Sequence, residues 1–268
     1  MPDLSLPDIS LHYEVTGTGP PLLMIAGLMS DSASWAPLLT ELEPHFTLIR
    51  PDNRSTGRTT PWDAPCSLDL WAQDACALLD HLGYDRASVL GHSLGGMIGW
   101  HMAQTTPNRV TALMTMGTAP RISRRNIALF ETLITVRNSD APKDTWLRAL
   151  FPWLFSSTVY QHAPDALEAA IAQSLSYPHA QSAQAMAHQL NALLAADIIS
   201  VQSSHDVPIQ ALLGENDLLL PLKEGLTALK GIETKIIKNA GHSLHWDAPT
   251  EVSHIIRAFF QETPPDDT

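Results

Sequence analysis

One serine lies in a segment that is typical of a nucleophile. Ser93 stands in Gly91-His92-Ser93-Leu94-Gly95, with a short apolar run before it and a helical pattern after it. This G-x-S-x-G pattern at a strand-to-helix turn projects the hydroxyl from a sharp bend, and the glycines let the strand and the helix approach closely. The free N–H groups that begin the helix favour a negatively charged oxygen nearby. The segment therefore predicts Ser93 as the nucleophile of an acyl transfer.

A serine hydroxyl is a weak nucleophile and needs a base to take its proton. The sequence has 12 histidines, so position must distinguish a candidate. His242 follows the last predicted strand in the short loop Asn239-Ala240-Gly241-His242-Ser243, and it is the predicted base. His245, three residues later, is a weaker alternative.

The base in turn needs a carboxylate that orients it and stabilises its protonated form. Gly214-Glu215-Asn216-Asp217 follows a predicted strand that ends at Leu213, and Asp217 is the predicted acid. Glu215 is the alternative because it lies closer to the end of the strand. The chain order nucleophile, acid, base is the order found in one large group of Ser-His-Asp enzymes.

An oxyanion on the attacked carbonyl needs two N–H donors. The backbone N–H of Leu94, directly after the nucleophile, is one predicted donor. The second is expected from the loop after the apolar run that ends at Ala26, and the N–H of Leu28 is the best candidate there.

Buried strands that alternate with helices must position these residues. Such alternation predicts an α/β protein with a mostly parallel sheet covered by helices on both faces. Since parallel sheets bind ligands at the carboxyl ends of their strands, all of the candidate residues fall where a site is expected. Strands are expected over 9–15, 22–26, 46–49, 87–90, 110–116, 208–213 and 234–237, with helices over 34–42, 68–82, 94–104 and 250–260.

The stretch 120–205 differs because it has no strand-like run. Helices are expected over 122–136, 143–154, 164–174 and 180–194, with prolines between them. We therefore predict a core domain formed by 1–119 and 206–268, and a helical cap formed by 120–205.

Five segments together resemble one known family. They are Ala26-Gly27-Leu28, the turn from Asp52 to Thr59, Gly91-His92-Ser93-Leu94-Gly95-Gly96, Gly214-Glu215-Asn216-Asp217 and Gly241-His242. In order and spacing the chain is similar to serine hydrolases of the α/β-hydrolase fold, and 120–205 corresponds to that family's cap. Ala26 departs from the His that many members have before this Gly, and Ser55 departs from a common Gly. Within the family, the chain is most similar to 3-oxoadipate enol-lactonases, aminoacrylate hydrolases and small-substrate esterases.

Apolar side chains from the cap and from the core are candidates for the substrate pocket, since such pockets are mostly apolar. They are Met29, Met97, Trp146, Trp153 and Phe155. Arg121, Arg124 and Arg125 cluster where the cap begins, and this run is more typical of a solvated helix face than of a carboxylate site.

Composition excludes several classes of protein. With 268 residues, 44% of them apolar and 16% charged, the chain is too apolar for a disordered protein, and two cysteines are too few for a disulfide scaffold. A net charge of −12 disfavours nucleic acid as a partner. Neither a leader nor a membrane-spanning run is apparent, so a cytoplasmic protein without a membrane partner is expected.

The sequence therefore predicts a hydrolase that cleaves a small carboxylic ester or lactone through an acyl-enzyme, with no metal or other cofactor. The same residues would also serve an amidase, a carbamate hydrolase or a carbon–carbon bond hydrolase. A binding protein with slow or no turnover is a further alternative. The negative net charge favours a neutral, fairly apolar substrate, because it repels anions.

Overall fold

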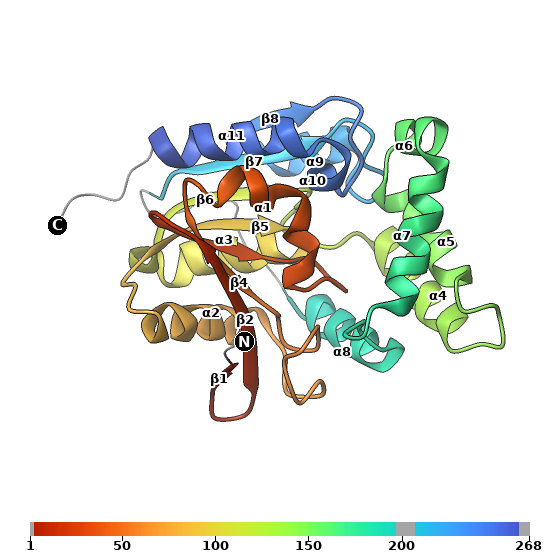
Figure 1. Ribbon diagram of the computed structural model, residues 1–268, viewed down its shortest axis with the longest axis horizontal. Helices are drawn as coiled ribbons and strands as arrows, with labels where there is room; N and C mark the ends of the chain where they lie inside the picture. Colours follow the sequence, from red (N-terminus) through yellow and green to blue (C-terminus); the bar gives the residue numbers. More distant parts are fainter. Residues whose placement is uncertain (1–2, 197–206, 263–268) are drawn as a thin grey trace.

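The computed structural model describes residues 3–196 and 207–262, and a twisted sheet forms its centre (Figure 1). Within these residues the sheet has eight strands in the order β1-β2-β4-β3-β5-β6-β7-β8. The β1–β2 and β2–β4 pairs are antiparallel, and the other pairs are parallel. The strands are β1 (Asp3–Ser5), β2 (Ser10–Gly17), β3 (Pro21–Ile25), β4 (Thr47–Pro51), β5 (Ala87–His92), β6 (Val110–Met116), β7 (Ile209–Gly214) and β8 (Glu233–Ile237). The expected α/β class with a mostly parallel sheet is confirmed.

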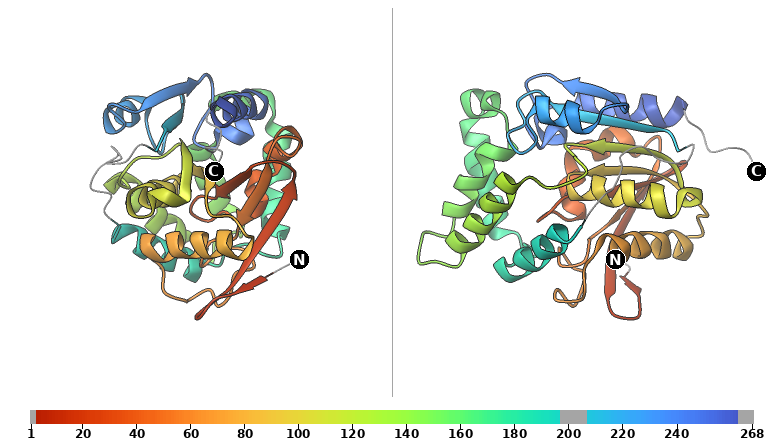
Figure 2. Two further views of the ribbon diagram at one scale, coloured as in Figure 1. Left: turned by 90° about the vertical axis from the view of Figure 1, so that its left-hand side faces the viewer. Right: turned by 180° about the vertical axis from the view of Figure 1, so that it is seen from behind.

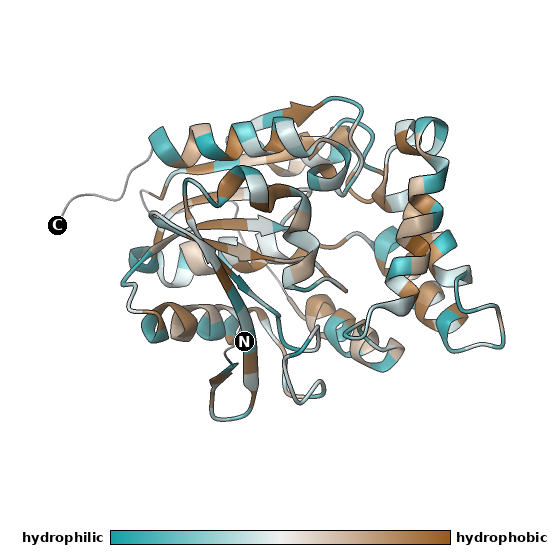
Figure 3. Cartoon of the chain, viewed as in Figure 1, coloured by the Kyte–Doolittle hydropathy of each residue, from teal (hydrophilic) through white to brown (hydrophobic). Residues whose placement is uncertain are grey.

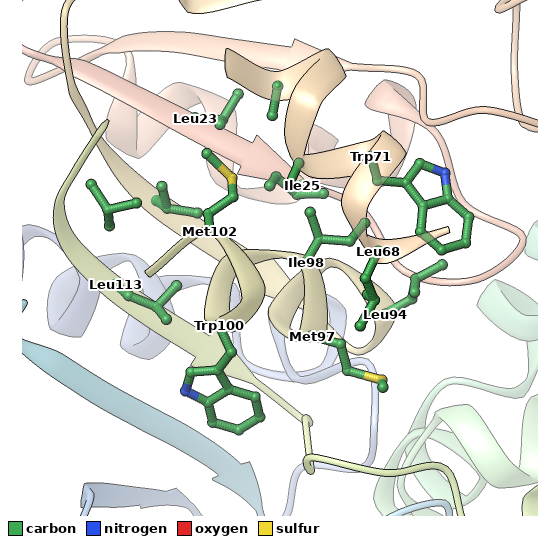
Figure 4. Packing of buried hydrophobic residues seen from close by; sticks show 14 of the residues in the cluster. Leu23, Ile25, Leu68, Trp71, Leu94, Met97, Ile98, Trp100, Met102 and Leu113 are labelled. Atoms are coloured by element: carbon green, nitrogen blue, oxygen red, sulfur yellow. The ribbon is translucent and has the colours of Figure 1, made fainter. Parts of the chain in front are cut away.

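Each face of the sheet supports its own apolar core, because successive side chains of a strand point to opposite faces. Leu23 and Ile25 of β3 pack with α2 (Leu68–His81) and α3 (Leu94–Thr105) on one face (Figure 4). Leu22 and Met24 pack on the other face. Three helices cover that second face: α1 (Ala36–Leu42), α10 (Leu244–Asp247) and α11 (Pro249–Glu262). Burial on both faces explains why the central strands are continuous apolar runs.

The last helix, α11, shows how helical spacing produces a covering layer. Its apolar residues Val252, Ile256 and Phe260 are spaced by four and are all buried. Figure 3 shows brown and teal residues alternating around this helix, as expected for one buried and one solvated face. The expected range 250–260 therefore differs from the observed helix only at the ends. The remaining short elements of the core are the single turns η1 (Ser32–Trp35) and η2 (Pro107–Arg109) and the helix α9 (Leu222–Ala228).

Five helices in the described part of the chain between β6 and β7 form a separate layer. Figure 1 and the right-hand view of Figure 2 place them to one side of the sheet, and α4 packs against both α5 and α8. The helices are α4 (Arg124–Arg137), α5 (Thr145–Leu154), α6 (Ser157–His162), α7 (Pro164–Ser176) and α8 (Ala183–Leu194). No strand occurs in the described part of this stretch, 120–196. Four of these helices were expected. The helix α6 was not predicted, since six residues are too few to display a helical period.

Candidate active site

Ser93 sits in a tight turn between a strand and a helix. It follows β5, is the N-cap residue directly before α3 and has a φ of 52°, a conformation that side-chain-bearing residues rarely adopt. Its N–H donates to the carbonyl of Met116 on the neighbouring strand at 2.9 Å. A Cβ on Gly95 would collide with the carbonyl oxygen of Ile25, and one on Gly91 would collide with the carbonyl of Gly95. Both glycines of the motif are therefore required by contacts with the backbone.

A histidine and a carboxylate meet beside this turn. The His242 Nδ1 and Asp217 Oδ2 atoms are 2.8 Å apart, and both side chains are buried. The second carboxylate oxygen of Asp217 accepts the N–H groups of Leu219 and Leu220, each at 2.8 Å. Three donors thus fix the carboxylate. Because its Oδ2 can only accept from Nδ1–H, the Nε2 atom of His242 is left to take up a proton.

The alternatives for acid and base lie elsewhere. Glu215 is exposed and accepts the N–H of Asn239, so it makes no contact with His242. His245 is buried against the ring of Trp35, with ring centroids 5.3 Å apart, and has no carboxylate partner among the described residues.

Ser93 and His242 line the same cavity. Within the described residues the Ser93 hydroxyl makes no hydrogen bond, and bonds of this type are often long before a substrate binds. The His242 ring lies against Gly117, which directly follows β6 and has a φ of 56°. A Cβ on Gly117 would come within 3.1 Å of Nδ1, so the absence of a side chain there makes room for the ring.

Two further histidines form a buried, uncharged layer next to His242. The Nε2 atom of His92 lies 3.0 Å from the carbonyl oxygen of His242, and its ring centroid is 4.7 Å from that of His245. Burial, and then the two neighbouring imidazoles, hold the pKa of His92 well below its usual value. Burial, and then the nearby His242, lower the pKa of His245 to about 3. Both rings are therefore neutral near pH 7.

Two unpaired N–H groups belong to residues that line the cavity together with Ser93. The N–H groups of Leu28 and Leu94 donate no hydrogen bond within the described residues, and both residues line the cavity. Leu94 is the first residue of α3, so its N–H has no partner within the helix. Leu28 lies in a turn that the Ser30 N–H closes onto the Gly27 carbonyl at 3.2 Å. These two groups can receive negative charge that develops on a substrate oxygen.

The cavity has a volume of about 620 Å³ and lies between the core and the cap helices. Four of the predicted pocket residues, Met29, Met97, Trp146 and Phe155, line it. Further apolar side chains of the cap complete its wall: Phe130, Leu147, Leu150, Phe151 and Leu154. The interior is thus suited to a small, mostly apolar molecule.

Trp153, the fifth predicted pocket residue, is not among the residues that line this cavity. It packs in the apolar cluster that includes Phe130 and Leu133 of α4, and the Arg125 guanidinium lies 5.8 Å from its centre. Trp153 therefore contributes to the apolar core of the cap. The sequence pattern alone does not distinguish such a residue from one that lines a pocket.

A few polar groups interrupt the apolar wall. The Arg137 guanidinium lies 4.3 Å above the ring of Trp146, and burial lowers its pKa. No carboxylate pairs with Arg137 among the residues that the structure describes. The Tyr177 hydroxyl donates to the Asp31 carboxylate at 2.8 Å across the cap–core boundary. None of these three groups was predictable from the sequence, because their contacts join separate elements of the folded chain.

The arginine cluster at the start of the cap does not act as a unit. Arg121 lines the cavity, whereas Arg124 is exposed and Arg125 donates to the Leu218 carbonyl outside it. The interpretation as a mainly solvated helix face therefore agrees with two of the three positions.

The described residues were compared with the requirements of a metal site and of a membrane-spanning helix, and they meet neither. No group of three or more His, Cys, Asp or Glu side chains there is arranged to hold a metal ion. No helix there is long and apolar enough to cross a membrane.

Known proteins resemble this chain in sequence and in fold. The chain is 27% identical over 238 residues to a protein of Azorhizobium caulinodans named "Putative carbamate hydrolase RutD", covering 89% of each chain. An esterase from Thermogutta terrifontis has a similar structure, with a TM-score of 0.82, 23% identity and coverage of 95% of this chain and 94% of the other. The enol-lactonase of Burkholderia xenovorans has a TM-score of 0.82 and 22% identity, with coverage of 96% and 99%.

A family model decides the assignment. The model described as "alpha/beta hydrolase fold" matches residues 20–249, which is most of the chain. The similar structures share the fold. This chain belongs to the α/β-hydrolase fold family.

Proposed function

We propose that the chain is a serine hydrolase that cleaves a small carboxylic ester or lactone through an acyl-enzyme. The observation that carries this proposal is the buried His242–Asp217 pair at 2.8 Å, next to a serine held in a strained turn. In this proposal Ser93 is the nucleophile, His242 the base and Asp217 the residue that orients the base. The helices of the described residues 120–196 act as a cap that covers the site.

Acylation begins when His242 Nε2 takes the hydroxyl proton of Ser93 as the oxygen attacks the substrate carbonyl. The N–H groups of Leu28 and Leu94 stabilise the resulting oxyanion. Asp217 stabilises the protonated imidazole, and His242 then gives the proton to the leaving alcohol. In the second half, His242 removes a proton from water, which attacks the acyl carbon; the bond to the Ser93 oxygen then breaks, and His242 returns the proton to that oxygen as the acid is released.

The size and lining of the cavity support a small substrate. A volume of about 620 Å³ fits a short acyl chain with its leaving group, and the apolar wall favours a neutral acyl portion. Among ester-like substrates, lactones release no second product, so they need no separate exit for an alcohol.

Carbamate hydrolysis is the second candidate function. A specific observation favours it, because the curated relative from Azorhizobium caulinodans carries that name and aligns with 89% of the chain. The same serine, histidine and carboxylate would attack a carbamate carbonyl and release an amine or ammonia. Amide and carbon–carbon bond hydrolysis use the same machinery, and a binding protein would need none of it.

A hydrolysis panel tests these alternatives. The panel contains p-nitrophenyl butyrate, a short lactone, a small carbamate and a small amide, each tested with wild-type protein and with Ser93→Ala. We expect turnover of the ester and the lactone that disappears in Ser93→Ala. Turnover retained in that variant would refute the serine mechanism. Release of ammonia from the carbamate at a higher kcat/KM would shift the function to the second candidate. A shift in melting temperature with no turnover of any compound would indicate a binding protein.

A further inference from the structure

A buried glutamine of the cap reaches the loop that carries the candidate oxyanion donor Leu28. Gln189, on α8, is fully buried. Its Oε1 atom accepts the N–H of Met29 at 3.2 Å, although the two residues are 160 positions apart in the chain. Its Nε2 atom donates to the carbonyl of Arg54 at 3.2 Å. One cap side chain therefore bridges two loops of the core.

The orientation of this amide follows from its neighbours. The Met29 N–H can only donate and the Arg54 carbonyl can only accept, so the oxygen and nitrogen of Gln189 have a single arrangement. Gln181 supports it, because its Nε2 donates both to Gln189 Oε1 at 3.2 Å and to the Ser55 carbonyl at 2.8 Å.

Several hydrogen bonds hold Arg54, the core residue to which the Gln189 side chain donates. Arg54, whose carbonyl accepts from Gln189, is buried and its guanidinium bonds two carboxylates. Its Nε donates to Asp74 at 2.6 Å, and its other nitrogens donate to Asp8 at 2.6 and 3.0 Å. Gln189 thus links the oxyanion loop to a fixed point of the core.

The bond to Met29 selects one form of the turn at 27–30. The Ser30 N–H bonds to the Gly27 carbonyl, and Met29, the third residue of the turn, has a φ of 66°. A positive φ at this position alone marks a type II turn, which usually has glycine there, whereas a type I turn has the central peptide inverted. Met29 has a side chain, so this form needs external support, and Gln189 holds the central peptide by its N–H.

Leu28 lies in a loop that is restrained at both ends. On one side the Asn53 Nδ2 donates to the Ala26 carbonyl at 3.0 Å, and on the other side Gln189 holds the Met29 N–H. The Gly27 carbonyl points toward Ser30, and in a trans peptide the Leu28 N–H must point the opposite way. Type I and type II turns share this first peptide, so the bond to Gln189 does not set the direction of the Leu28 N–H within the turn; it ties the turn that carries this N–H to the cap.

We propose that Gln189 is a positioning residue: through the Met29 N–H it anchors the turn at 27–30, and with it the Leu28 N–H, at the place where the oxyanion forms. This inference rests on the proposed function, because the oxyanion belongs to the Ser93 reaction. It also makes the cap a part of the catalytic geometry, in addition to its place as one wall of the cavity.

Gln189→Met tests the proposal, since methionine has a similar length but does not replace the acceptor. We expect kcat for p-nitrophenyl butyrate, per titrated active site, to fall about tenfold, less than the 10²–10³-fold cost of removing an oxyanion donor outright. The affinity for butylboronic acid, which forms an anionic tetrahedral adduct on serine, should fall by a similar factor. The KM and the pH profile should not change. A residue needed only for folding would lower the active fraction without changing kcat per active site.

Two further variants give the matched comparison. Gln189→Glu keeps an acceptor for Met29 and should retain kcat within about threefold of wild type, although the protein melts at a lower temperature. Gln184→Met lies on the exposed side of the same helix and should behave as wild type. Equal impairment of Gln189→Met and Gln189→Glu, or an unchanged kcat in Gln189→Met, would overturn the proposal.

Hydrogen exchange in the wild-type protein tests the same geometry without any substitution. The Met29 amide should exchange slowly with and without the boronic acid, whereas the Leu28 amide should become protected only in the adduct. Fast exchange at Met29 would overturn the inference alone. If wild-type protein shows no turnover that depends on Ser93, the proposed function fails, and this inference fails with it.

Discussion

The core wall and the cap wall of the cavity hold their residues in different ways. On the core wall, Ser93 and Gly117 lie in turns with φ values of 52° and 56°, and a Cβ on Gly95 would meet backbone. On the cap wall, Trp146 and Phe151 are side chains of a helix, and they are placed by packing within apolar clusters. The core therefore fixes the reacting atoms through backbone positions that accept few substitutions. The cap sets which molecules fit through side chains that are individually replaceable.

The strongest test of the core wall is Asp217→Asn. The amide no longer favours the histidine tautomer that leaves Nε2 free, so we expect kcat to fall by about 10⁴ while the protein stays folded. The assay is p-nitrophenyl butyrate hydrolysis, with circular dichroism to verify folding. Glu215→Gln, the matched change at the exposed neighbour, should leave kcat near that of wild type. A loss smaller than tenfold in Asp217→Asn would move the orienting role away from this residue.

The buried histidines predict how the core responds to acid. The pKa of His92 and His245 is lowered in the folded protein, so below about pH 6.5 the unfolded chain binds protons that the folded protein does not. The free energy of unfolding should therefore fall as the pH drops from 6.5 toward 5, by about 1.4 kcal/mol per pH unit for each such histidine. Urea unfolding at several pH values measures this slope.

His245→Gln isolates one of the two contributions to the acid response. Between pH 6.5 and 5, the free energy of unfolding of this variant should change less steeply with pH than that of wild type, by the contribution of one histidine. Parallel slopes for the two proteins would show that His245 is protonated in the folded state.

On the cap wall, Trp146→Leu should change binding more than chemistry. Trp146 lines the cavity, so loss of its ring removes contact area from the acyl chain, and we expect KM for p-nitrophenyl hexanoate to rise about tenfold. The kcat should stay within about threefold of wild type. Trp153→Leu is the matched control, because that ring lies outside the cavity and its loss should leave KM unchanged. A large fall in kcat for Trp146→Leu would contradict the division between the two walls.

The smallest expected effect concerns charge on the cap wall. Arg137 is a partly exposed cation without a carboxylate partner in the described residues, so it should favour an acyl chain that ends in a carboxylate. In Arg137→Gln, we expect kcat/KM for mono-p-nitrophenyl adipate to fall about threefold relative to p-nitrophenyl hexanoate. The difference should shrink at high salt, and Arg124→Gln, an exposed position, should show none. An unchanged ratio between the two esters in Arg137→Gln would remove Arg137 from the determinants of specificity.

The same division explains what the sequence could predict. The turn around Ser93 is encoded locally, since five adjacent residues carry both the nucleophile and the glycines that make room for it. His242 and Asp217 were identifiable because each follows a strand whose carboxyl end must lie at one edge of a parallel sheet. The strands themselves were visible as apolar runs, whereas the short helices α6 and α10 span too few residues to show a period.

Contacts between distant segments were not predictable in this way. Trp153 and Trp146 lie seven residues apart on one helix, and only packing against α4 decides which ring reaches the cavity. Gln189 offered one signal, because it is a polar residue within the buried stripe Ala183, Met186, Leu190 and Leu193 of α8. A glutamine in such a stripe needs hydrogen-bond partners. Its partner Met29, however, is 160 residues away and becomes apparent only in the folded chain.

The cap also meets the loop that carries His242, and this contact bears on attempts to exchange caps between relatives. The Ser243 N–H donates to the Leu154 carbonyl at 2.9 Å, and the Asp247 carboxylate accepts the N–H groups of Gly241 and Ser156 at 2.6 and 3.1 Å. A chimera that replaces the whole insertion with that of another hydrolase would lose the Ser243–Leu154 and Asp247–Ser156 bonds, and of these three bonds the histidine loop would keep only the one between Asp247 and Gly241 within the core. A graft that retains the segment 154–156 and Gln189 would transfer a new binding surface. It would also keep the hydrogen bonds from the cap to the loops that carry His242 and Leu28.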